Sequence, residues 1–161
     1  MDKGASGTVT DAPLSAGGGE ALAEGLRLLQ KAERTATELR SALLPRYGQA
    51  ETEAALAWLV ARRLLSDDRA AEAVVRPRIA GRRAEGDGKL RERLERRGAS
   101  AEAIEKALSE APDEAQRMQE ALVAKFRPED GQRAKAGRFL LSRGFDEEAV
   151  DGALDRFFHE G

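Results

Sequence analysis

Arginine and lysine side chains concentrate in the middle of this sequence. Between Arg62 and Arg97 there are 12 Arg or Lys residues against 7 Asp or Glu residues, a local excess of +5, although the whole chain has a net charge of −2. A local positive field of this kind attracts anionic partners even when the complete protein is close to neutral. The chemistry that these residues offer is therefore the recognition of negative charge.

The same stretch contains Gly86, Asp87, Gly88 and Lys89, a combination that invites comparison with a phosphate-binding loop. Such a loop needs a preceding strand and the spacing G-x-x-x-x-G-K-[ST], and this sequence has neither. We expect instead a glycine-flanked turn that leads into a helix at Leu90. Nucleotide binding is not expected.

Side chains that could catalyse a reaction or hold a metal are few. Asp67 and Asp68 are adjacent carboxylates, but no third ligand lies nearby, and after Ser66 they fit the capped first turn of a helix. His159, the only histidine, lies next to the chain end with no partner to orient its ring. The chain has no cysteine, so a disulfide and a thiolate metal site are both impossible. We therefore expect no enzyme, no metal and no other cofactor.

Two stretches of the chain repeat one another: LRERLERRGASAEAIEKAL begins at Leu90, and AGRFLLSRGFDEEAVDGAL begins at Ala136. In each, a helical pattern ends at Arg-Gly, where glycine can adopt the left-handed conformation that closes a helix. Two residues later, Ser100 or Asp146 can cap a new helix. The predicted unit is a helix, a glycine corner and a capped helix.

A looser third copy has its corner at Gly48, so that the glycines of the three corners are 50 and 46 residues apart. This spacing fits a repeat of two or three helices. We predict an all-α fold, an elongated array of three tandem three-helix repeats with a disordered N-terminal tail. Within the repeats, Pro77 is expected to kink or restart a helix and Asp130 to cap one. The predicted boundaries are 1–19 for the glycine-rich tail, 20–64 for the first repeat, 65–110 for the second, basic repeat and 111–161 for the third.

The composition agrees with small aliphatic cores, because 41% of the residues are hydrophobic, only 4% are aromatic and 35% are charged. Trp58, the only tryptophan, is expected in core or interface packing, since one aromatic among aliphatic residues does not form a base-stacking surface. The longest apolar run, Ala54 to Ala61, is far below the roughly 20 residues that span a bilayer. With no apolar leader pattern near Lys3, we expect a cytoplasmic protein without membrane contact.

Four stretches, taken in order, resemble the RecX family, bacterial modulators of the RecA recombinase. The resemblance extends from about Glu20 to Phe158. Its motifs are Thr37-Glu-Leu-Arg, Leu64-Leu-Ser-Asp-Asp68, Gly86-x-Gly88-Lys89 followed by Leu94 and Arg97-Gly98, and Phe139-Leu-Leu-Ser-Arg-Gly-Phe145. The chain departs from the family pattern at Ala70, since the family usually has an aromatic residue two positions after the Asp-Asp pair, and at Pro77.

The resemblance implies a non-enzymatic regulator that binds within the groove of the RecA–DNA filament and hinders strand exchange, ATP hydrolysis and co-protease activity. Such a regulator would act in DNA recombination, DNA repair and the SOS response. The implied partner is the RecA filament, protein plus single-stranded DNA. We also expect weak direct binding of DNA and a monomeric chain. The residues that we expect to contact the filament are Arg78, Arg82, Arg83, Lys89, Arg93 and Arg97.

Two other classes of function remain open. A helical protein that binds DNA directly through its basic middle unit is one, because helix-turn-helix units also contain a glycine turn. Against it, the helices after Gly98 and Gly144 begin with acidic residues where a recognition helix reads bases. The other class is a general helical adaptor for another protein.

Overall fold

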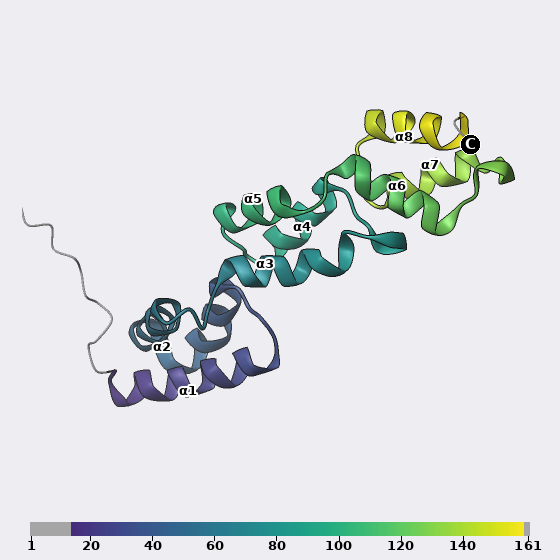
Figure 1. Cartoon of the computed structure of the whole chain (residues 1–161). Helices are drawn as coiled ribbons and strands as arrows, with labels where there is room; N and C mark the ends of the chain where they lie inside the picture. Colours follow the sequence, from purple (N-terminus) through teal and green to yellow (C-terminus); the bar gives the residue numbers. More distant parts are fainter. Residues whose placement is uncertain (1–13, 160–161) are drawn as a thin grey trace, which may run out of the picture. The chain divides into compact units, whose positions relative to one another are not determined.

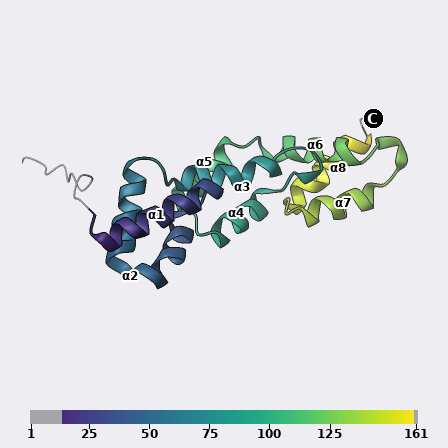
Figure 2. The same cartoon turned by 90° about the horizontal axis from the view of Figure 1, so that it is seen from below.

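The computed structural model describes residues 14–159. Within this range the chain is entirely helical, with eight α-helices and three short 3-10 helices and no strand (Figures 1 and 2). The predicted all-α class is confirmed. The α-helices are α1 (Ala16–Lys31), α2 (Ala36–Ala61), α3 (Asp67–Val75), α4 (Asp87–Arg96), α5 (Ala101–Glu110), α6 (Glu114–Lys125), α7 (Arg133–Ser142) and α8 (Glu147–His159). The 3-10 helices are η1 (Arg76–Arg78), η2 (Gly81–Arg83) and η3 (Pro128–Asp130).

The chain divides into two compact units, Met1–Asp67 and Asp68–Gly161. The first unit holds one hydrophobic core, made by leucines of α2 and by Leu65, with α1 packed against it. The second unit holds two cores, one from α3, α4 and α5 and one from α6, α7 and α8. The three predicted repeat boundaries stay a prediction.

The first unit begins earlier than the predicted tail allows. Ala16 to Gly19 form the first turn of α1, and the Ser15 side chain caps it by accepting a hydrogen bond from the Gly18 backbone N–H at 3.0 Å. Glycine is tolerated in this helix because it permits close packing: a Cβ at Gly25 would lie 3.2 Å from Leu59 Cδ1. The predicted tail is therefore wrong for residues 16–19, and its residues 1–13 lie outside the described part of the chain.

Helix α2 contains the first glycine corner. Gly48 has φ +77° within the span assigned to α2, so two helical segments meet there at a kink. The helix starts with a capping box, in which the Thr35 hydroxyl accepts from the Glu38 N–H and the Glu38 carboxylate accepts from the Thr35 N–H, both at 3.0 Å. Trp58 packs against the core of this unit, as predicted.

The second unit confirms the other two corners. Gly98 and Gly144 have φ of +73° and +79°, so both adopt the left-handed conformation. The Ser100 hydroxyl accepts from the Ala103 N–H, and the Asp146 carboxylate accepts from the Ala149 N–H, each at 3.2 Å. The predicted sequence of helix, glycine corner and capped helix therefore describes α4–α5 and α7–α8.

Pro77 acts as predicted, because α3 ends at Val75 and the chain continues in the 3-10 helix η1. Ala70 is 1% exposed, so a small side chain fills a buried place on α3. The expected cap at Asp130 is wrong. Asp130 lies in η3, Gly131 adopts the left-handed conformation after it, and α7 begins at Arg133 without a side-chain cap.

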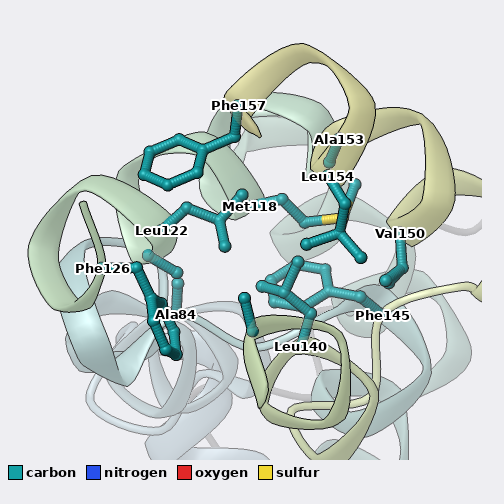
Figure 3. Packing of buried hydrophobic residues seen from close by; sticks show 12 residues of the cluster. Ala84, Met118, Leu122, Phe126, Leu140, Phe145, Val150, Ala153, Leu154 and Phe157 are labelled. Carbon is teal, nitrogen blue, oxygen red and sulfur yellow. The ribbon is translucent and has the colours of Figure 1, made fainter. Parts of the chain in front are cut away.

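The last core is the largest of the three and contains most of the phenylalanines. Figure 3 shows Met118 of α6, Leu140 of α7 and Leu154 of α8 converging with Phe145, which lies in the corner between α7 and α8. Ala84, from the segment between η2 and α4, is also part of this cluster and is fully buried. The cores of the second unit are thus joined by the stretch that leads into α4.

Candidate functional site

An open hollow in the second unit is lined mainly by arginine. One part, of about 350 Å³, is formed by Pro77, Arg78, Arg83, Glu85, Arg93 and Arg143. An adjoining part, of about 230 Å³, shares Arg78 and Arg93 and adds Ala73, Val74, Arg96 and Arg97. We call this surface the arginine hollow. Six guanidinium groups and one carboxylate line it, which leaves a charge of +5.

The local backbone explains why arginines from distant positions meet there. Pro77 ends α3 and starts η1, and the Arg78 guanidinium folds back so that Nη1 donates to the Val74 carbonyl at 2.6 Å. Arg83 comes from η2, and Arg93 projects from α4 one turn beyond Leu90, whose side chain is buried. The hollow is therefore lined by residues of η1, η2 and α4, together with Arg143, which follows α7.

Glu85 is the only acidic residue that lines the hollow, and it is 2% exposed. Arg93 binds it through two parallel hydrogen bonds, Nε to Oε2 at 2.7 Å and Nη2 to Oε1 at 2.8 Å. Arg78 Nε lies 3.8 Å from Glu85 Oε1. The hydrogen bonds that Arg93 donates to the Glu85 carboxylate raise the pKa of Arg93, so this guanidinium keeps its charge.

Backbone hydrogen bonds connect Glu85 and Gly86 with two other positions of the hollow. The Glu85 N–H donates to the Arg78 carbonyl at 3.0 Å, and the Gly86 N–H donates to the Arg143 carbonyl at 2.9 Å. Gly86 has no room for a side chain, because a Cβ there would lie 2.2 Å from the Gly144 carbonyl oxygen. The segment before α4 is therefore held against the glycine corner between α7 and α8.

Arg117 of α6 fixes the same segment from inside the protein. Its side chain is 1% exposed and donates three ways: from Nε to the Pro112 carbonyl at 2.8 Å, from Nη1 to the Glu85 carbonyl, and from Nη2 to the Asp87 carboxylate. A buried guanidinium requires such partners, because an unpaired charge away from water is costly. Arg117 therefore positions the backbone that carries Glu85.

The six arginines and lysines predicted from the sequence separate into two groups. Four of them, Arg78, Arg83, Arg93 and Arg97, lie in the arginine hollow. The other two contact ends of helices. Arg82 Nε donates to the Ala124 carbonyl in the last turn of α6 at 2.9 Å, and Lys89 Nζ donates to the Ser142 carbonyl at the end of α7 at 3.0 Å. Cations are favourable at these helix ends. Binding of a partner by any of the six stays a prediction.

Sequence reasoning missed Arg143, Glu85, Arg96 and Arg117. A signal for Arg143 was present, since it occupies the same place before its corner glycine as Arg97 does before Gly98. Both of these repeated arginines line the hollow. For Glu85 and Arg117, no spacing pattern marks a carboxylate or a guanidinium as buried.

The remaining candidate residues have structural partners. Asp67 Oδ1 accepts from the Ala36 N–H at 2.8 Å, at the start of α2, and Asp68 pairs with Lys106 Nζ at 3.2 Å. His159 Nδ1 lies 3.1 Å from the Asp155 carbonyl. Within residues 14–159 no three His, Cys, Asp or Glu side chains gather as a metal site would require. Each helix within residues 14–159 is too short or too polar to span a bilayer.

Sequence comparison finds several curated relatives. The chain is 42% identical over 130 residues to the regulatory protein RecX of Thermus thermophilus, a match that includes 80% of this chain and 85% of the relative. It is 39% identical over 137 residues to the regulatory protein RecX of Chromohalobacter salexigens, with 81% and 88% of the two chains matched. For the regulatory protein RecX of Herbaspirillum seropedicae the identity is 35% over 138 residues, with 82% and 87% matched.

A solved structure has the same fold. The crystal structure of RecX from Lactobacillus salivarius superimposes with a TM-score of 0.72, at 18% sequence identity, over 89% of this chain and 98% of the other. No protein-family model matches the chain.

Proposed function

The chain belongs to the RecX family of regulatory proteins, and from this premise we propose that it binds the RecA–DNA filament and inhibits its recombinase, ATPase and co-protease activities. The arginine hollow is the observation that carries the proposal. Its charge of +5 is concentrated on one surface, whereas the whole chain has a net charge of −2. A filament that contains DNA offers a continuous row of negative charge for such a surface.

In this proposal, inhibition follows from occupying the filament groove. A protein whose arginines contact the filament at several points at once gains affinity from each contact, because later contacts form within an already bound complex. A second DNA strand would then have to displace it before strand exchange. We propose that the chain acts as a cytoplasmic monomer and catalyses no reaction of its own, in keeping with relatives that are named regulatory proteins.

Titration of the purified protein into RecA strand-exchange and ATPase assays tests this function. We expect inhibition of both activities that increases with the amount of protein. Replacing both Arg83→Gln and Arg143→Gln should raise the amount needed for half inhibition roughly tenfold, because two solvent-accessible ion pairs contribute about 0.5–1 kcal/mol each and about 1.4 kcal/mol corresponds to a factor of ten.

The control is Arg156→Gln, which removes one positive charge from an exposed position of α8 that does not line the hollow, for comparison with Arg83→Gln and Arg143→Gln made singly. It should inhibit as the unmodified protein does. Failure of the unmodified protein to change either RecA activity at stoichiometric excess would reject the proposed function.

Direct binding to duplex DNA is the second candidate function, and the same charge on the hollow favours it. The starts of α5 and α8 oppose sequence-specific reading, since Glu102, Glu147 and Glu148 lie in their first turns. Base-reading residues are normally placed at this end of a recognition helix. Binding to naked duplex as tight as binding to the filament, at the same salt concentration, would favour this alternative.

A further inference from the structure

We propose that Glu85 is the positioning residue of the arginine hollow, and that the hollow so arranged binds the phosphodiester backbone of single-stranded DNA. This inference rests on the proposed function, because it identifies the part of a RecA–DNA filament that the hollow contacts. The inference gives the Glu85 carboxylate a role in a site that binds an anion, namely to hold the arginines in place.

The chemistry of the lining favours phosphate. All six cations of the hollow are arginine and none is lysine. The planar guanidinium presents paired N–H donors that match two oxygens of one phosphate, whereas an ammonium acts as a point charge. No aromatic ring lines either part of the hollow, so bases have no stacking surface there, and contacts to the backbone of the strand are expected without sequence preference.

Glu85 is suited to hold these arginines in place because it is itself fixed on every side. Its N–H is bonded to the Arg78 carbonyl, its carbonyl accepts from Arg117, and the next N–H in the chain donates to the Arg143 carbonyl. Its carboxylate accepts both parallel hydrogen bonds from Arg93. Glu85 thus contacts Arg78 of η1 and Arg93 of α4 directly, and its neighbour Gly86 connects the same segment to Arg143 after α7.

This arrangement leaves the hollow able to bind a further anion. Arg93 uses Nε and Nη2 for Glu85, and no hydrogen bond from Arg83 or Arg143 to an acidic side chain is found among the described residues. A guanidinium that is already oriented loses less side-chain entropy when a phosphate binds. Without the carboxylate, like charges on Arg78 and Arg93 would repel each other and the side chains would spread into solvent.

Two explanations of Glu85 predict opposite results for Glu85→Gln. If the carboxylate only reduced the positive charge of the hollow, its neutralisation would strengthen binding of an anion. If it positions Arg93 and Arg78, neutralisation weakens binding although the hollow becomes more positive. The sign of the change therefore distinguishes a positioning residue from a charge that merely opposes the ligand.

The experiment measures binding of a fluorescein-labelled oligothymidylate by fluorescence anisotropy at several salt concentrations, using the full chain. We expect Glu85→Gln to weaken binding roughly three- to tenfold, the range that corresponds to the net contribution of one hydrogen bond of typical strength. Arg143→Gln should weaken binding and lower the slope of log affinity against log salt by about one, as expected for one phosphate contact.

A double-mutant cycle tests whether Glu85 acts through Arg93. In an Arg93→Gln background, Glu85→Gln should change the affinity by less than it does alone, because the arginine that is hydrogen-bonded to the carboxylate is already gone and only Arg78 is still positioned by it. Arg156→Gln serves as the matched charge control and should lower the affinity less than Arg143→Gln. Thermal unfolding followed by circular dichroism checks that each variant is folded, and Arg143→Gln tests the hollow independently should Glu85→Gln unfold.

Stronger oligonucleotide binding by Glu85→Gln would overturn the inference, and so would displacement of the oligonucleotide by polyglutamate at an equal concentration of charge. Failure of this inference is distinguishable from failure of the proposed function. A protein that inhibits RecA while these variants bind the oligonucleotide unchanged loses the inference alone. A protein whose hollow binds the oligonucleotide as expected but leaves RecA unaffected loses the proposed function.

Discussion

At the scale of single residues, Gly86 is a position of the second unit that has no room for a side chain. Its N–H is bonded to Arg143, and a Cβ would overlap the carbonyl group of Gly144 and the Cα of Phe145. Both of those neighbours are backbone atoms of the corner between α7 and α8, which cannot rotate away as a side chain would. Gly86 thus determines how closely the segment before α4 approaches that corner.

We expect Gly86→Ala to lower the free energy of unfolding by about 1–3 kcal/mol or more, since overpacking a buried contact forces the backbone to move. Chemical denaturation followed by circular dichroism measures it. The control is Gly88→Ala, two residues away in the first turn of α4, where a Cβ would lie 3.7 Å from its nearest neighbour. That change should be neutral or stabilising by up to about 1 kcal/mol, because alanine favours a helix over glycine. Equal effects of the two changes would contradict the packing argument.

The same scale shows which part of the site could be predicted from sequence. The density of arginines between Arg62 and Arg97 predicted a basic surface, because charge is a property of the residue itself. Which of them face one hollow depends on folding: Arg82 and Arg93 look alike in sequence, yet one donates to the end of α6 and the other to Glu85. Arg117 was unpredictable because its burial requires carbonyl groups that only the folded chain brings together.

At the scale of helices, the corners could be predicted because their determinants are local. A glycine with positive φ and a capping side chain two residues later act within a few residues, so Gly98 with Ser100 and Gly144 with Asp146 carry the information directly. The start of α1 could not be predicted in this way. Its glycines are poor helix formers, and the helix is stabilised by packing against α2, whose leucines lie far along the chain.

The start of α2 supplies a prediction at this scale. Thr35→Ala removes the hydroxyl that accepts from the Glu38 N–H and breaks the capping box. We expect a loss of about 1 kcal/mol in the stability of the first unit, within the usual range of 0.5–2 kcal/mol for an N-cap. The fluorescence of Trp58, the only tryptophan, reports unfolding of this unit, because its ring packs against the core there.

Thr37→Ala is the matched control for this prediction. Thr37 is exposed and already lies inside α2, so its replacement should change the stability by less than about 0.5 kcal/mol, as is usual for exposed sites. Equal midpoints of the unfolding transition for Thr35→Ala and Thr37→Ala would exclude a capping role for Thr35.

At the scale of the whole molecule, each core is made by residues of one unit. The leucines of the first core all precede Asp68, and all residues of the two other cores follow it. The two cores of the second unit are joined by buried polar contacts of Arg117 and by the Gly86 contact with the last corner. Cooperativity is therefore expected within each unit, since cooperative unfolding follows shared packing.

This division predicts that the effects of the two stability variants separate. Gly86→Ala should lower the midpoint of the circular dichroism transition of the second unit and leave the Trp58 fluorescence transition in place. Thr35→Ala should do the reverse, since mutations that share no packing partners act additively. The double variant should then show both shifts, each of the size seen alone. If Gly86→Ala moved the Trp58 transition as far as the circular dichroism transition, the two units would unfold as one, and the stability of the first core would have to depend on the second unit.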